Sequence, residues 1–331
     1  MPPASDRVAG PGPALADWSR REERGSALAL RAMTFISLRI GRPAGRFFLY
    51  FIAAYFFAFA PRARRHARAY LRRALGREPT PLDRFRHILT FASTIHDRVY
   101  LVNEQHRLFR ISVEGESLVH QHVQTRRGAF LMGAHLGSFE VTRALGQQQS
   151  GLRVVMAMYE ENATKINAQL ASINPAASFG VVPLGRMDAM LRIHGCLEEG
   201  AFVGVLGDRT VGADDARVVS FLGEPARLPV SAMRAAAILR RPVIFMAGLY
   251  RGGNRYHIVF EPLADFSHTG RAERAAAVEA ALVRYASLLE KYCRSDPYNW
   301  FNFYDFWAGG RESASRPRSP APGASSRSPA S

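Results

Sequence analysis

One short stretch, GAHLGSFE at 133–140, places a histidine and a glutamate five residues apart, His135 and Glu140. On one continuous helix that spacing turns the two side chains about 140° away from each other, so they would not meet. The apolar run before His135 predicts a buried strand, Gly137 allows a bend, and Ser138 is a favourable N-cap residue. The chain is therefore predicted to reverse direction, with Glu140 in the first turn of the following helix.

This reversal predicts an acid–base dyad. A carboxylate in a first helical turn is favoured by the helix dipole, and Glu140 could accept the Nδ1 proton of His135. The other ring nitrogen would then be a base that deprotonates a hydroxyl without a serine nucleophile. The residues leave a second interpretation open, in which His135 caps the helix and Glu140 is an ordinary first-turn residue.

A second polar pair, Asp208 and Arg209, follows another apolar run within GVLGDRTVG at 204–212. Because ligands bind at the carboxyl ends of strands in α/β sheets, Arg209 is predicted to hold a phosphate or the developing oxyanion of a thioester. Backbone N–H groups near 137–139 would assist it, and Asp208 would orient it. The alternative is a local ion pair on the surface.

Other catalytic patterns are missing from the sequence. It has no G-x-S-x-G elbow, no glycine-rich nucleotide-binding pattern after a strand and no convincing metal-ligand spacing. Cys196 and Cys293 are far apart and predict neither a disulfide framework nor a zinc site. The sequence therefore predicts no metal and no cofactor.

Apolar runs alternate with helix-like segments from residue 80 onward, which predicts an α/β fold with a mixed, mostly parallel sheet covered by helices. Strands are predicted at 109–113, 128–134, 152–158, 179–184, 201–206, 241–250 and 256–263. Helices are predicted at 82–102, 116–124, 138–149, 163–172, 187–198, 230–240 and 271–293.

The N-terminal region is hydrophobic and basic. Residues 47–60 are fourteen apolar residues without a charge, whereas a membrane span needs about 20. Seven arginines follow between Arg62 and Arg77. We expect a helical anchor embedded in the membrane interface, with arginines on lipid phosphates; a true span and a buried core helix are the alternatives. The arginines assigned to phosphate contact are Arg62, Arg64, Arg65 and Arg68.

The net charge of +16 indicates anionic partners such as lipid headgroups or an acidic carrier protein. Nucleic acid is not expected, because no recognition fold accompanies the basic segment. The predicted organisation is a flexible tail at 1–25, anchoring helices at 26–78, an α/β domain at 79–310 and a disordered tail at 311–331.

Taken in order, these blocks resemble the lipid A biosynthesis acyltransferases of the late lauroyl/myristoyl type. That family lies within the wider H-x-x-x-x-[DE] glycerolipid acyltransferase group. The resemblance covers about residues 26–307 and rests on GAHLGSFE, GVLGDRTVG, FLGEPARLPVSAMRAAAIL and DPYNWFNFYDFW. Where the family usually has an arginine, between 160 and 185, this chain has Lys165, which becomes a candidate substrate contact. Together with the aromatic ending, this departure is similar to the aryl-polyene branch.

The resemblance implies an acyltransferase on the cytoplasmic face of the inner membrane. Its acyl donor would be a thioester of acyl-carrier protein or coenzyme A, and its acceptor a hydroxyl of a lipid or glycolipid. His135 would be the general base and Glu140 its carboxylate partner, with Gly137, Ser138, Asp208 and Arg209 at the substrates. Two rival functions stay open: a thioesterase or lipase that uses the same dyad, and a non-catalytic membrane scaffold in which His135 and Glu140 are structural. The scaffold would show a His135–Glu140 distance too long for a hydrogen bond and no groove beside the pair.

Overall fold

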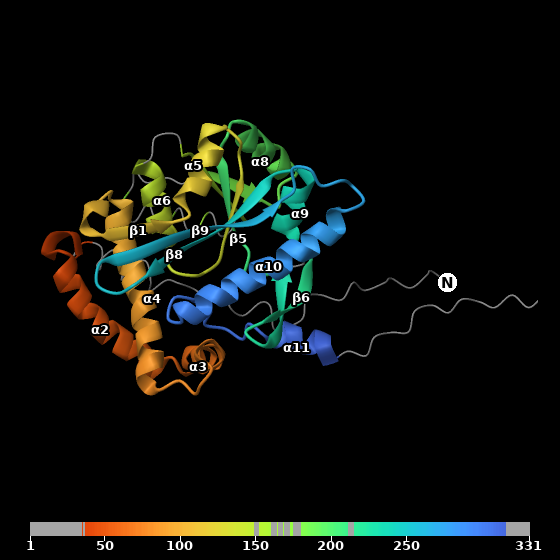
Figure 1. Cartoon of the computed structure of the whole chain (residues 1–331). Helices are drawn as coiled ribbons and strands as arrows, with labels where there is room; N and C mark the ends of the chain where they lie inside the picture. The colour runs from red at the N-terminus through yellow and green to blue at the C-terminus, as the bar shows by residue number, and fades with distance from the viewer. Residues whose placement is uncertain are drawn as a thin grey trace, which may run out of the picture.

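The computed structural model describes residues 35, 37–148, 152–159, 164, 168, 173–174, 180–210 and 215–315. Its centre is a seven-stranded sheet in the order β1-β9-β8-β2-β5-β3-β4 (Figure 1). Neighbouring strands are parallel except β8 and β9. The strands are β1 (Arg110–Glu114), β2 (Phe130–Gly133), β3 (Val154–Tyr159), β4 (Val181–Leu184), β5 (Phe202–Leu206), β8 (Pro242–Tyr250) and β9 (Arg255–Asp265). The predicted α/β class is confirmed.

Helices cover both faces of the sheet, and strand β8 shows how the two apolar layers form. Every residue of β8 is buried, because alternate side chains point to opposite faces. Phe245 stacks on Tyr292, with ring centroids 5.6 Å apart, whereas Ile244 packs in the opposite layer. The first layer contains α3 (Pro61–Leu75), α8 (Ala189–Glu198), α9 (Ser231–Ile238) and α10 (Arg274–Ser295); the second contains α4 (Pro81–Val102), α5 (Glu116–Gln124) and α6 (Phe139–Gln148).

All seven predicted strands are present, but the sequence missed a β-hairpin. Strands β6 (Ala216–Phe221) and β7 (Glu224–Pro229) pair antiparallel through a tight turn at Leu222 and Gly223, both with positive φ. Two prolines in β7 hid it, since proline is rare inside strands. The helix predicted at 163–172 falls mostly outside the described residues. Two further short elements are a 3-10 helix at His106–Leu108 and α11 (Ala308–Ser315), which extends into the segment predicted as a tail.

The N-terminal helix α2 (Arg42–Phe59) lies at the edge of the molecule (Figure 1). A narrow stripe of Gly45, Leu49 and Ala53 is buried, and α2 contacts α4. Its other faces expose large apolar side chains: Phe47, Phe48, Tyr50, Phe51, Ile52, Tyr55, Phe56 and Phe59. Within the described residues, no single helix meets the length and hydropathy of a membrane span. Helices α2 and α3 meet them only as a pair bent by 96°.

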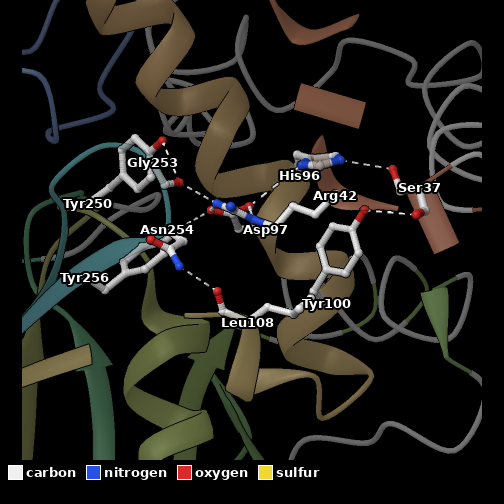
Figure 2. Close-up of polar contacts among 10 residues, drawn as sticks. All are labelled: Ser37, Arg42, His96, Asp97, Tyr100, Leu108, Tyr250, Gly253, Asn254 and Tyr256. Carbon is white, nitrogen blue, oxygen red and sulfur yellow. Dashed lines mark hydrogen bonds and ion pairs between the residues drawn. The ribbon is translucent and has the colours of Figure 1, made fainter. Parts of the chain in front are cut away.

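A buried ion pair fixes the start of α2 to the core (Figure 2). Arg42 binds Asp97 of α4 through two nitrogens, at 2.8 and 2.9 Å, and it also donates to the carbonyl of Gly253 in the β8–β9 turn. The hydroxyl of Tyr256 donates to the same carboxylate at 2.9 Å. Burial opposes ionisation of Asp97, but its contacts with His96, Arg42 and Tyr256 outweigh it and lower the pKa of its carboxyl group. Arg42 therefore faces the protein and not the surroundings of α2.

Candidate active site

The site forms where two neighbouring parallel strands end. His135 follows β2 and Asp208 follows β5, and these strands pair directly, so both residues lie at the same edge of the sheet. Nδ1 of His135 lies 2.8 Å from Oδ1 of Asp208. The backbone N–H of His135 donates to Oδ2 of the same carboxylate at 3.0 Å. Asp208 thus holds both the ring and the backbone of the histidine.

Asp208 is fully buried and accepts several hydrogen bonds. The indole N–H of Trp300 donates to Oδ2 at 3.0 Å, and the side-chain amide of Asn302 donates to the same oxygen at 2.9 Å. Burial opposes its ionisation, but the contacts with His135, Arg209 and Asn302 outweigh it and hold the pKa of Asp208 well below its ordinary range. Since an ionised carboxylate only accepts hydrogen bonds, Nδ1 of His135 carries a proton, and in the neutral form of the ring Nε2 is the base.

The bend after His135 needs glycine at position 137. Gly137 has φ +75°, and a Cβ there would lie 2.0 Å from the carbonyl oxygen of Gly248. The N–H of Gly137 donates to the carbonyl of Asn299, and the N–H of Ser138 donates to that of Gly248. These two backbone donors are occupied, so the prediction that they stabilise an oxyanion is wrong.

Glu140 lies in the first turn of α6, as predicted, but its carboxylate has different partners from those expected. Oε1 lies 2.6 Å from Nε of Arg98, and the hydroxyl of Ser138 donates to Oε2 at 3.0 Å. Nδ1 of His135 is occupied by Asp208, so the predicted hydrogen bond from His135 to Glu140 is not the one observed. The glutamate is mostly buried and forms an ion pair with Arg98 across the site.

Arg209 is positioned by the C-terminal segment and not by Asp208, contrary to the prediction. Its Nε donates to Oδ1 of Asn302 at 2.7 Å, and NH2 donates to the carbonyl of Phe301 at 3.0 Å. The guanidinium also lies over the ring of Tyr304, 5.6 Å from its centroid. Among the described residues NH1 has no hydrogen-bond partner, and Arg209 lines the cavity beside His135.

A cavity of about 450 Å³ adjoins these residues, within the range of about 300–1,000 Å³ usual for small-molecule sites. Four of its polar residues are His135, Glu140, Arg98 and Arg209, and its other walls are largely apolar. The apolar and aromatic lining is formed by Phe91, Ile95, Phe139, Met156, Met158, Leu206, Phe301 and Phe303. A chamber with both charged groups and apolar walls suits a substrate with a polar reacting centre and a hydrocarbon chain. The hypothesis of a non-catalytic scaffold predicted that no groove lies beside His135. The cavity contradicts that part of the prediction.

A model of the bacterial lipid A biosynthesis acyltransferase family matches residues 22–308. The chain belongs to this family. Membership makes the protein an acyltransferase that acts on lipid, and it implies a lipid acceptor and an acyl donor. Members are typically associated with bacterial membranes. No curated protein matches the chain.

The other residues predicted for this acyltransferase lie away from His135 or outside the described part. Lys165 is not among the described residues. The four arginines assigned to phosphate are on α3, where Arg62, Arg65 and Arg68 are exposed and Arg68 pairs with Glu78. Arg64 instead donates to the carbonyls of Phe57 and Ala58, at the end of α2.

The sequence alone missed three residues of the acyltransferase site. Arg98 comes from α4, and Trp300 and Asn302 come from the aromatic ending. An arginine on the otherwise apolar face of the 82–102 helix was one available signal. The ending gave another, since its polar side chains interrupt an aromatic run. Residues 299–301 reach the site as an extended segment: Trp300 bridges Leu136, and the N–H of Phe301 donates to the carbonyl of His135 at 2.8 Å.

Proposed function

We propose that the protein transfers an acyl chain from a thioester to a hydroxyl of a lipid or glycolipid, with His135 as the general base. The observation that carries the proposal is the 2.8 Å contact between Nδ1 of His135 and Asp208, beside a largely apolar cavity. This contact directs the lone pair of Nε2 away from the buried carboxylate. The side chain of His135 is 29% exposed, so an acceptor hydroxyl can reach it.

The proposed reaction proceeds by direct attack. Nε2 of His135 takes the hydroxyl proton while the acceptor oxygen bonds to the thioester carbonyl carbon. The carbonyl becomes an oxyanion and then re-forms as the C–S bond breaks. The leaving thiolate takes the proton back from the imidazolium, so the histidine is restored and no acyl-enzyme forms. Asp208 stabilises the imidazolium between these two proton transfers.

Arg209 is the proposed electrostatic partner of the oxyanion. Two of its nitrogens are held by Asn302 and Phe301, so the guanidinium is fixed before substrate binds. A preorganised cation stabilises charge that develops in the transition state without the cost of reorganisation. Glu140 keeps its place in the proposed catalytic site as the carboxylate that holds Arg98 at the cavity wall, and not as the partner of the histidine ring.

Membrane attachment through α2 and α3 is the second part of the proposal. Exposed aromatic residues recur along the whole length of α2, and a patch of this kind is unusual on a soluble monomer. We propose that α2 embeds in the cytoplasmic face of the inner membrane while exposed arginines of α3 bind anionic lipids. The donor would be acyl-carrier protein or coenzyme A, without a further cofactor, and the acceptor would include lipid A or aryl-polyene lipids.

The experiment that tests the proposed function follows thioester consumption with and without lipid acceptor. Purified full-length protein in detergent micelles receives an acyl-carrier-protein thioester, and product is measured by mass spectrometry. Thioester loss that depends on the acceptor, with an acylated lipid as product, supports transfer. Equal loss without acceptor would identify a thioesterase and overturn the proposal.

A further inference from the structure

A second cavity, of about 540 Å³, lies on another side of helix α4 from the active-site cavity. Arg86, Thr90 and Ser93 line it from α4, at spacings that share one helix face. Phe91 and Arg98 line the active-site cavity from a different face of the same helix. The remaining walls of the second cavity come from α2, the β8–β9 turn and the loop after α10. We call this cavity the α2–α4 cleft.

Positive charge predominates in the α2–α4 cleft. Its lining includes Arg46, Arg86 and Arg251 but a single carboxylate, Asp296. Arg251 forms an ion pair with Asp296 at 2.8 Å. Arg46 and Arg86 have no carboxylate partner among the described residues, although Arg86 contacts the hydroxyl of Tyr298. Within the described part of the chain, the cleft therefore presents two guanidinium groups without a carboxylate partner.

Arg46 carries a hydrogen-bond donor that the described part of the protein leaves unused. Its NH1 is buried and has no hydrogen-bond partner there, while the guanidinium packs over the ring of Tyr250, 5.8 Å from the centroid. A buried donor without an acceptor is unfavourable, and an anion in the cleft would satisfy it. Arginine suits phosphate in particular, since its planar donors match two phosphate oxygens at once.

We propose that the α2–α4 cleft binds the phosphate of a membrane lipid headgroup. This inference rests on the proposed attachment of α2 to the membrane. Arg46 and Tyr50 line the cleft from α2, while Phe47 and Phe51 of the same turns are 61% exposed. A phosphate in the cleft would thus lie beside aromatic side chains that enter the acyl region, the depth at which tyrosine and arginine meet headgroups.

A soluble acidic partner fits the same surface less well. An acyl-carrier protein would supply phosphate or carboxylate groups to Arg46 and Arg86, but it would leave the neighbouring aromatic side chains in water. A lipid headgroup satisfies the arginines while its acyl chains cover Phe47 and Phe51. The phosphate would also hold α2 against α4, because the cleft contains residues from both helices.

The test measures sedimentation of the purified full chain with vesicles of phosphatidylcholine alone or mixed with phosphatidylglycerol. Arg46→Gln and Arg86→Gln are the test variants, and Arg192→Gln, an exposed position on α8, removes the same charge elsewhere. Each test variant is expected to weaken binding to the mixed vesicles by about tenfold, the effect of one lost charge-assisted hydrogen bond. Arg192→Gln is expected to change binding by less than about twofold.

Three results would overturn the inference. Equal weakening by all three variants would show that only total charge matters. Stabilisation of wild-type protein by inorganic phosphate, with vesicle binding unaffected by the cleft variants, would indicate a site for free phosphate. Weaker binding of acyl-carrier protein, without a change in vesicle binding, would indicate a carrier-protein site. If the glutamine variants fail to fold, Arg46→Lys and Arg86→Lys retain the charge but lose the planar donors, and they are expected to bind vesicles more weakly.

The two proposals fail separately. Wild-type protein that binds vesicles through the cleft but transfers no acyl group would contradict the proposed function alone. If the wild-type protein transfers acyl groups but the Arg46 and Arg86 variants bind vesicles as well as it does, only the proposal for the α2–α4 cleft is contradicted.

Discussion

Replacing Asp208 with asparagine tests the hydrogen-bond geometry around the catalytic histidine. In the structure Oδ2 accepts from the backbone N–H of His135, from Trp300 and from Asn302, whereas the one donor to Oδ1 among the described residues is Nδ1 of His135. An asparagine at 208 would keep its single oxygen towards the three donors. Its amide N–H would then point at Nδ1, which must become the acceptor, and the proton would move to Nε2.

The expected effect on activity is large because Nε2 would no longer be a base. Aspartate-to-asparagine changes that force the wrong histidine tautomer slow other enzymes by about 10⁴-fold, or about 5.5 kcal/mol in the activation free energy. The fold should survive, since every donor to Oδ2 keeps an acceptor. Weakening the charge-assisted bonds should reduce the free energy of unfolding by about 1–3 kcal/mol.

The assay combines acceptor-dependent acyl transfer with ¹⁵N NMR of the imidazole, which reports the tautomer of His135. Asp83→Asn is the control, because Asp83 is also a buried carboxylate but caps α4 and pairs with Arg77. The control should lose stability and keep its activity per folded molecule. A folded Asp208→Asn protein with the proton still on Nδ1, or with activity within about tenfold of wild type, would refute the reasoning.

Three further predictions concern neighbouring features. Glu140→Gln should slow acyl transfer by about 100-fold, the effect of one lost electrostatic contact in an active site. NMR should still find the proton on Nδ1 of His135, and a change of tautomer would contradict the pairing of His135 with Asp208. Burial lowers the pKa of His87 from 6.5 to about 4, although its bond to a backbone carbonyl opposes this. Stability should therefore be full above pH 6.5 and fall by about 3 kcal/mol as pH drops towards 4. In urea unfolding, His87→Gln should reduce the change in the free energy of unfolding with pH. An unchanged pH dependence would show that another group causes it. Gly137→Ala should lower the free energy of unfolding by at least about 2 kcal/mol more than Gly223→Ala does in the same urea assay. The reason is that Gly223 shares the positive φ but has open space around it. Equal losses for the two variants would contradict the steric argument.

The strands were predictable because each is an apolar run bounded by turn residues. The run 241–250 is a good example, since burial on both faces requires continuous hydrophobicity, and it became β8. The reversal at GAHLGSFE was also predictable, because glycine and an N-cap serine are local signals. The hairpin at 216–229 was not, since its prolines oppose a strand assignment and its packing against the C-terminal aromatic residues decides the outcome.

The partner of His135 could not be predicted from local spacing. Glu140 is close in sequence, but Asp208 is close in space because β5 pairs with β2, even though β3 and β4 lie between them along the chain. Strand order depends on tertiary packing, and no short stretch encodes it. Arg98 was missed for the same reason, because its role depends on where α4 lies relative to the strand ends.

The most direct test of the account is a single-turnover measurement of acyl transfer by His135→Gln, which keeps a polar side chain but removes the base. The account predicts that the folded variant binds acyl thioester and lipid acceptor yet forms product at least about 10³-fold more slowly than wild type. Product formation at the wild-type rate would contradict the assignment of His135 as the general base.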